Sequence, residues 1–317
     1  MAESPATSGP FRHVGFFYRT AKEYATTVAA FLGDGVAAGE PAFAALPKGQ
    51  LSLVADALGA DARRVEFADM TELGRNPARI IPRVQAFIDL HAGQHVRYVG
   101  EPIWASRSGA ELQEATRHEA LVNLAFAGAD AEILCPYDTT RLGQAVIAEA
   151  RQTHPLLLSG GDEGTSPEYS GPFGLPSSCG APLPALPDTA MIHTYRSDLS
   201  QVRALVLKSA REAGLPDERA GDLVLAVSEV AANTLRHTPS PGTLVIWHDS
   251  HEIVCEVHDD GVITDPLAGR RRPGPAALGG HGLWLVHRVC DLVELRSDNA
   301  GTTVRMHMAI RSPRPLS

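Results

Sequence analysis

A short glycine-rich run near the C-terminus carries the clearest chemical signal in the sequence. Residues 279–282 (GGHG) open a predicted helix, and Gly280 and Gly282 are two of the three glycines in it. Glycines at such a position expose backbone N–H groups and let a phosphate approach the positive end of the helix dipole. The run therefore predicts a phosphate site, with an ordinary helix start after a loop as the alternative.

Three polar residues share one face of an earlier predicted helix. Glu229 and Asn233 are four positions apart, and His237 follows four positions later. Residues at this spacing lie on the same face of an α-helix. The alternative to a binding surface is a solvated polar face, because the opposite face carries the apolar residues Leu223, Val227, Val230 and Leu235.

Two further short features lie at predicted strand ends. Asp259-Asp260-Gly261 closes one strand, where an ordinary Asp-Gly turn is the alternative. Gly301-Thr302-Thr303 follows a strand turn and is uninformative by itself. The order of the four features along the chain is more specific than any one of them.

Together the four features resemble the GHKL ATPase family, the ATP-binding fold of histidine kinases, gyrase-type ATPases and Hsp90-like chaperones. The run SEVAANTLRHT resembles the N-box of that family, and HDDGVI resembles its first glycine box. GGHGLWLV is similar to the second glycine box and AGTTVRM to the last motif. Within the family, the compact layout looks most like the bacterial anti-sigma factor serine/threonine kinases.

The resemblance implies ATP and Mg²⁺ as cofactors and a role for each matched residue. Asn233 would coordinate Mg²⁺ through its side-chain oxygen, and Glu229 would be the catalytic base for an attacking hydroxyl. Asp259 would accept a hydrogen bond from the adenine amino group, with Thr302 or Thr303 in support. The cofactor-binding residues that the resemblance implies are Asn233, His237, Asp259, Gly261, Gly280, Gly282, Leu283, Thr302 and Thr303.

Two features near these motifs, Ile263 and the run of arginines 270–272, modify the expectation. Ile263 replaces the second glycine of the first glycine box, and a β-branched residue strongly disfavours a positive φ. The loop must therefore follow a different path if the family glycine uses that conformation. Three arginines occupy residues 270–272, between the two glycine boxes. They belong to a solvated loop in one interpretation and contact a phosphate or a partner in the other.

The segment that holds these motifs, 190–311, predicts an α+β sandwich, the fold of a GHKL ATPase. Helices are expected over 199–214, 216–238 and 281–293. Strands are expected over 242–250, 252–260, 293–298 and 302–310, the last two joined by a hairpin at Asn299-Ala300-Gly301. Helices gathered on one antiparallel or mixed sheet are typical of this class.

The first segment, 11–159, alternates predicted strands and helices. Strands are expected over 14–18, 50–55, 63–69, 96–101 and 131–138, and helices over 22–36 (ended by Gly33 or Gly35), 80–93, 109–129 and 139–154. This alternation predicts an α/β domain with a mostly parallel sheet, and we expect that fold to resemble the RecA/KaiC type. No G-x-x-x-x-G-K-[ST] run occurs, so a P-loop is not expected.

This first segment resembles the MEDS domain, a DcmR-type sensory module of bacterial regulators. The resemblance is carried by HVGFFYRTAKEY, FLGDGVAAGEPAF and RHEALVNLAFAGADAEILCPYD. It implies a small-molecule or signal ligand without naming it. Residues that match the pattern are His13, Glu40, Glu119, Cys135, Tyr137 and Asp138, although Cys135 also fits a core position and Asp138 a helix cap.

Length, composition and charge agree with two domains. The 317 residues exceed the usual size of one domain, and residues 160–189 form a linker rich in glycine and proline. A net charge of −9 argues against direct nucleic-acid binding. Four widely spaced cysteines, no visible secretory signal and no long apolar run favour a cytoplasmic protein without a membrane segment.

These observations lead to one expected function and two alternatives. We expect a signal-responsive anti-sigma regulatory factor that phosphorylates a serine or threonine of a STAS-domain anti-anti-sigma partner, sequesters a sigma factor, or does both. The first alternative is a non-catalytic ATP-binding module that sequesters its partner. The second is a sensor histidine kinase, for which His118 is the one tempting acceptor. A homodimer is a further possibility, because related kinase domains commonly dimerise.

Overall fold

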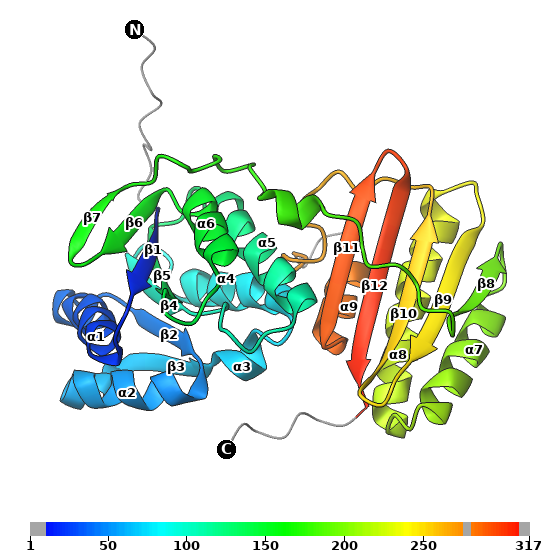
Figure 1. Cartoon of the computed structure of the whole chain (residues 1–317), viewed down its shortest axis with the longest axis horizontal. Helices are drawn as coiled ribbons and strands as arrows, with labels where there is room; N and C mark the ends of the chain where they lie inside the picture. The colour runs from blue at the N-terminus through cyan, green and yellow to red at the C-terminus, as the bar shows by residue number, and fades with distance from the viewer. Residues whose placement is uncertain (1–10, 275–279, 311–317) are drawn as a thin grey trace, which may run out of the picture. The chain divides into compact units, whose positions relative to one another are not determined.

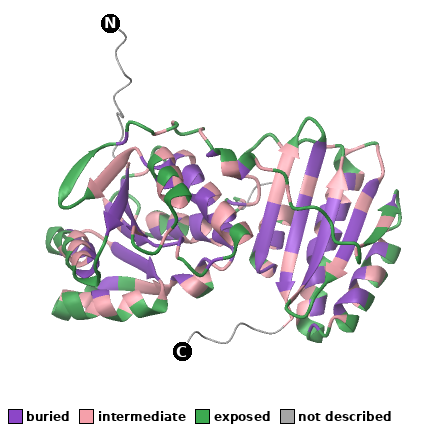
Figure 2. Cartoon of the chain, viewed as in Figure 1, coloured by how far each residue is buried: buried purple, intermediate pink, exposed green. Residues whose placement is uncertain are grey.

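The computed structural model describes residues 11–274 and 280–310, which divide into two compact units. The first unit runs from Met1 to Cys179 and the second from Gly180 to Ser317. Each unit has its own sheet and its own buried core (Figures 1 and 2). None of the described helices is long and apolar enough to cross a membrane.

The first unit is an α/β domain built on a seven-stranded sheet in the order β3-β2-β4-β5-β1-β6-β7. Neighbouring strands are parallel except β7, which runs antiparallel to β6. The mostly parallel sheet predicted from the sequence is therefore confirmed. Its strands are β1 Arg12–Tyr18, β2 Ala42–Leu46, β3 Val65–Asp69, β4 Val96–Gly100, β5 Ala131–Asp138, β6 Leu156–Ser159 and β7 Asp162–Thr165.

Two groups of helices flank this sheet: α1 packs with α2, and α5 packs with α4 and α6 (Figure 1). Strand residues alternate between the two sides. In β1, Val14, Phe16 and Tyr18 belong to the core beneath α1 and α2, so His13 and Gly15 point to the other side. The helices are α1 Ala21–Ala38, α2 Lys48–Leu58, α3 Met70–Leu73, α4 Ile80–Leu90, α5 Gly109–Ala125 and α6 Gln144–Thr153.

Helix α2 and strand β2 of this unit differ from the sequence prediction. Residues 50–55 lie inside helix α2, whereas a strand was expected. Short apolar runs do not distinguish a strand from a helix, and here Leu51, Val54 and Leu58 have helical spacing with Val54 fully buried. Strand β2, which precedes α2 in the chain, was not predicted. Its alanine-rich sequence AFAAL has little strand propensity, but all of its residues are buried.

Helix α1 continues past both glycines that were expected to end it. It stops at Gly39, whose φ of 79° lies in the left-handed region that glycine adopts readily. Gly35 has a packing role instead, because a Cβ there would lie 2.6 Å from Cδ of Arg97 on β4. The missing side chain thus allows the helix to approach the sheet.

The second unit is an α+β sandwich, as the sequence predicts. Its five strands are all antiparallel and lie in the order β11-β12-β10-β9-β8. Helices α7, α8 and α9 pack on one face over a core that includes Val202, Leu223, Val286 and Met306. The elements are β8 Met191–Tyr195, α7 Leu199–Glu212, α8 Asp217–His237, β9 Gly242–His248, β10 Glu252–Asp259, α9 His281–Val289, β11 Leu292–Asp298 and β12 Gly301–Ala309.

The glycine- and proline-rich segment 160–189 contains some ordered structure. It includes strand β7 and a short 3-10 helix over Ser177–Gly180. Its last part lies against the face of the second sheet that the helices leave open (Figure 1). Arg296 donates to the Ala181 carbonyl and Arg305 to the Pro184 carbonyl, so this part of the segment belongs to the second unit.

Candidate functional site

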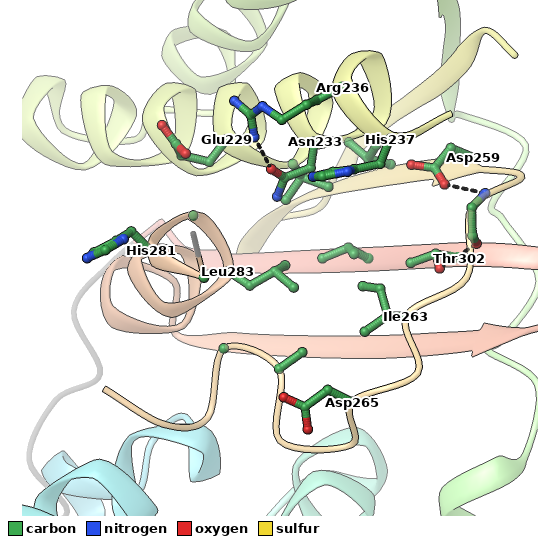
Figure 3. Close-up of a pocket in the computed structure, with 18 of the residues that line it drawn as sticks. Glu229, Asn233, Arg236, His237, Asp259, Ile263, Asp265, His281, Leu283 and Thr302 are labelled. Carbon is green, nitrogen blue, oxygen red and sulfur yellow. Dashed lines mark hydrogen bonds between the residues drawn. The ribbon is translucent and has the colours of Figure 1, made fainter. Parts of the chain in front are cut away.

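A cleft of about 1050 Å³ lies between α8, α9 and the loop that follows β10. Its volume is at the upper end of the range for small-molecule sites, roughly 300–1,000 Å³. Figure 3 shows polar side chains along α8 on one side of the cleft and apolar groups from the sheet and loop on the other. Of the residues that the sequence singled out, those that line the cleft include Glu229, Asn233, His237, Asp259, Gly261, Ile263, Arg271, Arg272, Gly280, Gly282, Leu283 and Thr302.

Helix α8 places the residues of the predicted polar face in the cleft. Glu229, Asn233 and His237 lie along α8 toward its C-terminal end and all line the cleft (Figure 3). The buried side of the same helix carries Leu223 and Val227, which anchor it to the sheet. The amphipathic pattern of α8 thus fixes which side chains face the cleft.

Helix α9 begins directly opposite this polar face. Gly280 has a φ of 84° and forms the N-cap of α9, and no side chain of the described residues caps that end. A Cβ at Gly282 would lie 3.0 Å from Oε2 of Glu229 and 3.3 Å from Nδ2 of Asn233. The uncapped N–H groups, the carboxylate and the amide therefore meet in one place. Gly279 lies outside the described residues.

Asp259 occupies the other end of the cleft, where β10 ends. Its Oδ1 accepts from the backbone N–H of Gly261 at 2.8 Å, and its Oδ2 accepts from Oγ1 of Thr234 at 2.6 Å. Thr234 in turn accepts from the hydroxyl of Tyr195 at 3.1 Å. Burial raises the pKa of Tyr195 to about 12, so this hydroxyl keeps its proton and orients the chain that ends on Asp259.

The two adjacent threonines of the last motif point in opposite directions. Thr302 lines the cleft and donates to the Gly261 carbonyl at 2.8 Å. The Thr303 hydroxyl contacts Nδ1 of His258 at 3.0 Å, and Thr303 does not line the cleft. Since successive strand residues face opposite sides of a sheet, only Thr302 can support the loop beside Asp259.

Ile263 lies in the cleft wall without backbone strain (Figure 3). Among the described residues every positive φ belongs to a glycine, so Ile263 does not take the left-handed conformation. Its backbone N–H donates to Oγ of Ser297 at 2.8 Å, and Ser297 contacts Oγ1 of Thr302 at 2.7 Å. Hydrogen bonds with β11 and β12 therefore hold the loop where the family pattern has a glycine.

The sequence reasoning missed several residues of this site. Tyr195 and Ser297 support it from positions that carry no motif signal. Thr234 supports it from inside the run SEVAANTLRHT, although that position was not singled out. Arg236 also lines the cleft and donates from Nη1 to Oδ1 of Asn233 at 2.9 Å. Its place on α8, three residues after Asn233, could have revealed it.

Several arginines lie in or near the cleft. Arg236, Arg271 and Arg272 line the cleft, whereas Arg270 is buried, with 3% of its surface exposed. The loop is held near α9 at Gly269, where a Cβ would lie 2.8 Å from Cβ of Leu283. Arginines around a cleft that contains an uncapped helix start are typical of a polyphosphate site.

The residues present fit ATP with Mg²⁺. The amide oxygen of Asn233 is an oxygen ligand that Mg²⁺ accepts, and the carboxylate of Glu229 lies beside it. The absence of a side chain at Gly282 leaves space beside both groups. Apolar residues from the sheet and loop offer a surface for a flat base next to the Asp259 carboxylate, among them Val257, Ile263, Leu267 and Val304.

Comparisons with protein families agree with this geometry. The profile of the MEDS family (MEthanogen/methylotroph, DcmR Sensory domain) matches residues 12–155. The profile of the histidine kinase-like ATPase domain matches residues 194–308, which include every cleft residue named above. A search of curated proteins found no match. The chain therefore joins an N-terminal MEDS domain to a C-terminal histidine kinase-like ATPase domain, the composition of an ATP-binding, kinase-like regulatory protein.

Proposed function

We propose that the protein is an anti-sigma regulatory factor whose C-terminal domain binds Mg²⁺-ATP and phosphorylates a serine or threonine of a STAS-domain anti-anti-sigma partner. It sequesters a sigma factor when that partner is phosphorylated. The MEDS domain receives the signal that shifts the protein between phosphorylating its partner and sequestering the sigma factor. The observation that carries the proposal is the convergence of Glu229, Asn233 and the start of α9 at Gly282.

Each group in the cleft has a part in the proposed transfer. Asn233 would hold Mg²⁺ through its amide oxygen, and an ion held there would neutralise part of the phosphate charge. The backbone N–H groups at the start of α9 would hold phosphate oxygens, and Asp259 would accept from the adenine amino group. Arg271 and Arg272 would screen the remaining negative charge.

The chemical step needs one proton acceptor. The partner's hydroxyl oxygen forms a bond to the γ-phosphorus while the bond from that phosphorus to the β,γ-bridging oxygen breaks, and ADP leaves. The hydroxyl proton passes to the carboxylate of Glu229, which lies one helical turn before Asn233. Positioning and charge neutralisation supply most of the catalysis in such reactions, so a single carboxylate is sufficient.

The test is transfer of radiolabelled phosphate from ATP to candidate STAS-domain proteins, such as one encoded next to this chain. We expect the E229Q variant to bind ATP normally but to lose transfer by at least about 100-fold. The N233A variant should lose Mg²⁺-dependent ATP binding. Undiminished transfer by E229Q would exclude its role as a base, and unchanged binding by N233A would exclude the metal assignment.

A non-catalytic role for ATP is the second candidate, and one contact favours it. Arg236 already hydrogen-bonds the Asn233 oxygen that Mg²⁺ would use. If this bond persists with nucleotide bound, ATP would act as a conformational ligand for partner binding. Partner-dependent turnover of ATP separates the two candidates, because a conformational ligand is bound and released unchanged.

The histidine kinase alternative has weaker support. His118, its candidate acceptor, lies within α5 of the MEDS domain with 3% of its surface exposed. A phosphoacceptor must be reached by the γ-phosphate of ATP, and a buried side chain is not accessible to it. Acid-labile phosphate on His118 after incubation with ATP would restore this alternative.

A further inference from the structure

Four residues with metal-binding side chains meet in the core of the MEDS domain, far from the ATPase motifs in sequence. They are His13 on β1, Glu119 on α5, Cys135 on β5 and His154 at the end of α6. One ligand atom from each lies within 4.8 Å of the others. All four are buried, with 0% to 3% of their surfaces exposed. The four side chains are therefore shielded from bulk solvent, which favours a structural over a catalytic role.

The hydrogen bonds of His154 determine which of its ring nitrogens is free. Nδ1 lies 2.7 Å from the Ala150 carbonyl oxygen, which can only accept, so Nδ1 carries the hydrogen. In the neutral ring, Nε2 then bears a lone pair. This atom lies 3.3 Å from Oε2 of Glu119 and has no hydrogen-bond partner among the described residues.

His13 is oriented in the same way by Asn123. The Asn123 amide nitrogen donates to the carbonyls of Ala120 and Thr153, which identifies Oδ1 as the atom facing His13. Nδ1 of His13 therefore donates to that oxygen at 3.1 Å. The remaining Nε2 lone pair of the neutral ring is directed at Oε2 of Glu119, 3.2 Å away. Metal-bound histidines commonly have their second nitrogen held by a carbonyl or amide in this manner.

Two nitrogen lone pairs thus face one carboxylate in a buried core, and a single cation placed among them would contact all three groups. The spacings suit a tetrahedral metal ion. Bonds of about 2.1 Å to nitrogen and oxygen give edges of about 3.4 Å in a tetrahedron, and a longer bond to sulfur gives about 3.6 Å. The structure has 3.2 Å and 3.3 Å for the nitrogen–oxygen edges and 3.4 Å from Cys135 Sγ to His13 Nε2.

We propose that His13, Glu119, Cys135 and His154 form a closed, structural Zn²⁺ site in the MEDS domain. Two imidazoles, one thiolate and one carboxylate are ligands that Zn²⁺ accepts, and four protein ligands leave no open position. On binding, the zinc–sulfur bond forms and the thiol proton leaves to solvent. The two anionic ligands balance the charge of the ion, so the buried site is neutral overall.

The site joins elements that are distant in sequence. Zinc would link β1 and β5 to α5 and to the end of α6 through one ion. Gly15 allows this arrangement, because a Cβ there would lie 3.1 Å from Cγ of the His154 ring. A bound ion stabilises the folded state in proportion to its affinity, so the metal would raise the stability of the MEDS domain.

The test uses the full chain, purified under reducing conditions, stripped with a chelator and titrated with Zn²⁺. Metal analysis should find about one zinc ion per chain. The C135A and H154Q variants should lose it, while C179A, which removes a buried cysteine outside the cluster, should retain it. Titration with Co²⁺ should give a thiolate charge-transfer band that C135A lacks.

Thermal unfolding supplies a second readout in case a variant folds poorly. Zn²⁺ should raise the melting temperature of the stripped wild-type chain and of C179A, and leave that of C135A and H154Q unchanged. The proposal is overturned if the folded wild-type chain binds no Zn²⁺ or Co²⁺, or if C135A and H154Q bind as much as wild type. Neither outcome depends on ATP or on phosphoryl transfer.

Discussion

Arg236 donates from Nη1 to Oδ1 of Asn233 at 2.9 Å, so a guanidinium already occupies the amide oxygen assigned to Mg²⁺. Both residues lie on α8, three positions apart, and both line the cleft. The hydrogen bond places a positive charge where the metal would lie. Metal binding at this oxygen therefore competes with the positive charge of Arg236, and that competition has a measurable cost.

The R236A variant should bind Mg²⁺ more readily in the presence of ATP. An exposed charged hydrogen bond contributes roughly 0.5–1 kcal/mol, so the Mg²⁺ concentration for half-maximal ATP binding should fall by about two- to fivefold. Calorimetric titration at several Mg²⁺ concentrations measures this shift. The control is K208A, which removes an exposed positive charge on α7 and should change nothing. A weaker Mg²⁺ dependence with lower ATP affinity would instead make Arg236 a phosphate ligand.

The T302A variant should weaken nucleotide binding through the loop that follows β10. It removes the hydrogen bond to the Gly261 carbonyl and leaves that carbonyl without its side-chain donor, at a cost of roughly 1–3 kcal/mol. ATP affinity should fall by about 5- to 100-fold. The adjacent T303A variant loses only the contact with His258 and should bind ATP as wild type does. Equal losses in both variants would contradict the assignment of Thr302 to the cleft.

The G282A variant should impair Mg²⁺-ATP binding because the new methyl group would enter the space between α8 and α9. It would lie 3.0 Å from Oε2 of Glu229 and 3.3 Å from Nδ2 of Asn233. The matched control is G221A on α8, where a Cβ meets nothing within 4 Å. That control should bind ATP normally and stabilise the helix by roughly 0.5–1 kcal/mol. Normal binding by G282A would show that the space at this position is not used.

The stability of the ATPase domain should fall as pH rises from about 6.5 to about 9, because of His307. Burial lowers the pKa of this histidine, but hydrogen bonds to Glu252 and Glu294 outweigh burial and raise the pKa to about 9. The folded-state pKa therefore exceeds the unfolded value. Protonated His307 therefore contributes to the free energy of unfolding in full below about pH 6.5. This contribution is at most roughly 3 kcal/mol and is lost as the pH rises through about 9.

Denaturant unfolding of wild type and H307Q at pH 6 and pH 9.5 measures this contribution. The difference between the two chains should be largest at the lower pH and shrink at the higher one. The variant H248Q, which changes an exposed histidine on β9, should follow the pH dependence of wild type. A constant difference between wild type and H307Q across this range would disprove the role of His307.

The lining of the cleft was largely predictable because its residues carry local signals. Helical spacing places Glu229 and Asn233 on one face, and a turn and a glycine run mark Asp259 and Gly280. The choice between Thr302 and Thr303 depends on strand register, which pairs Asp259 with Thr302 in an antiparallel ladder. Strand β2 and helix α2 were missed because short apolar runs such as 42–46 and 50–55 have no decisive period.

The sequence by itself determined the two-part composition of the chain and the order of the ATPase motifs, since each rests on residue types and short-range spacing. Only the tertiary structure brought His13 and His154, 141 positions apart, onto one carboxylate. The pairing of β1 with β5 and the packing of α5 and α6 beside them create that meeting. Contacts between distant segments form only when the sheet and helices pack, so local sequence patterns do not predict them.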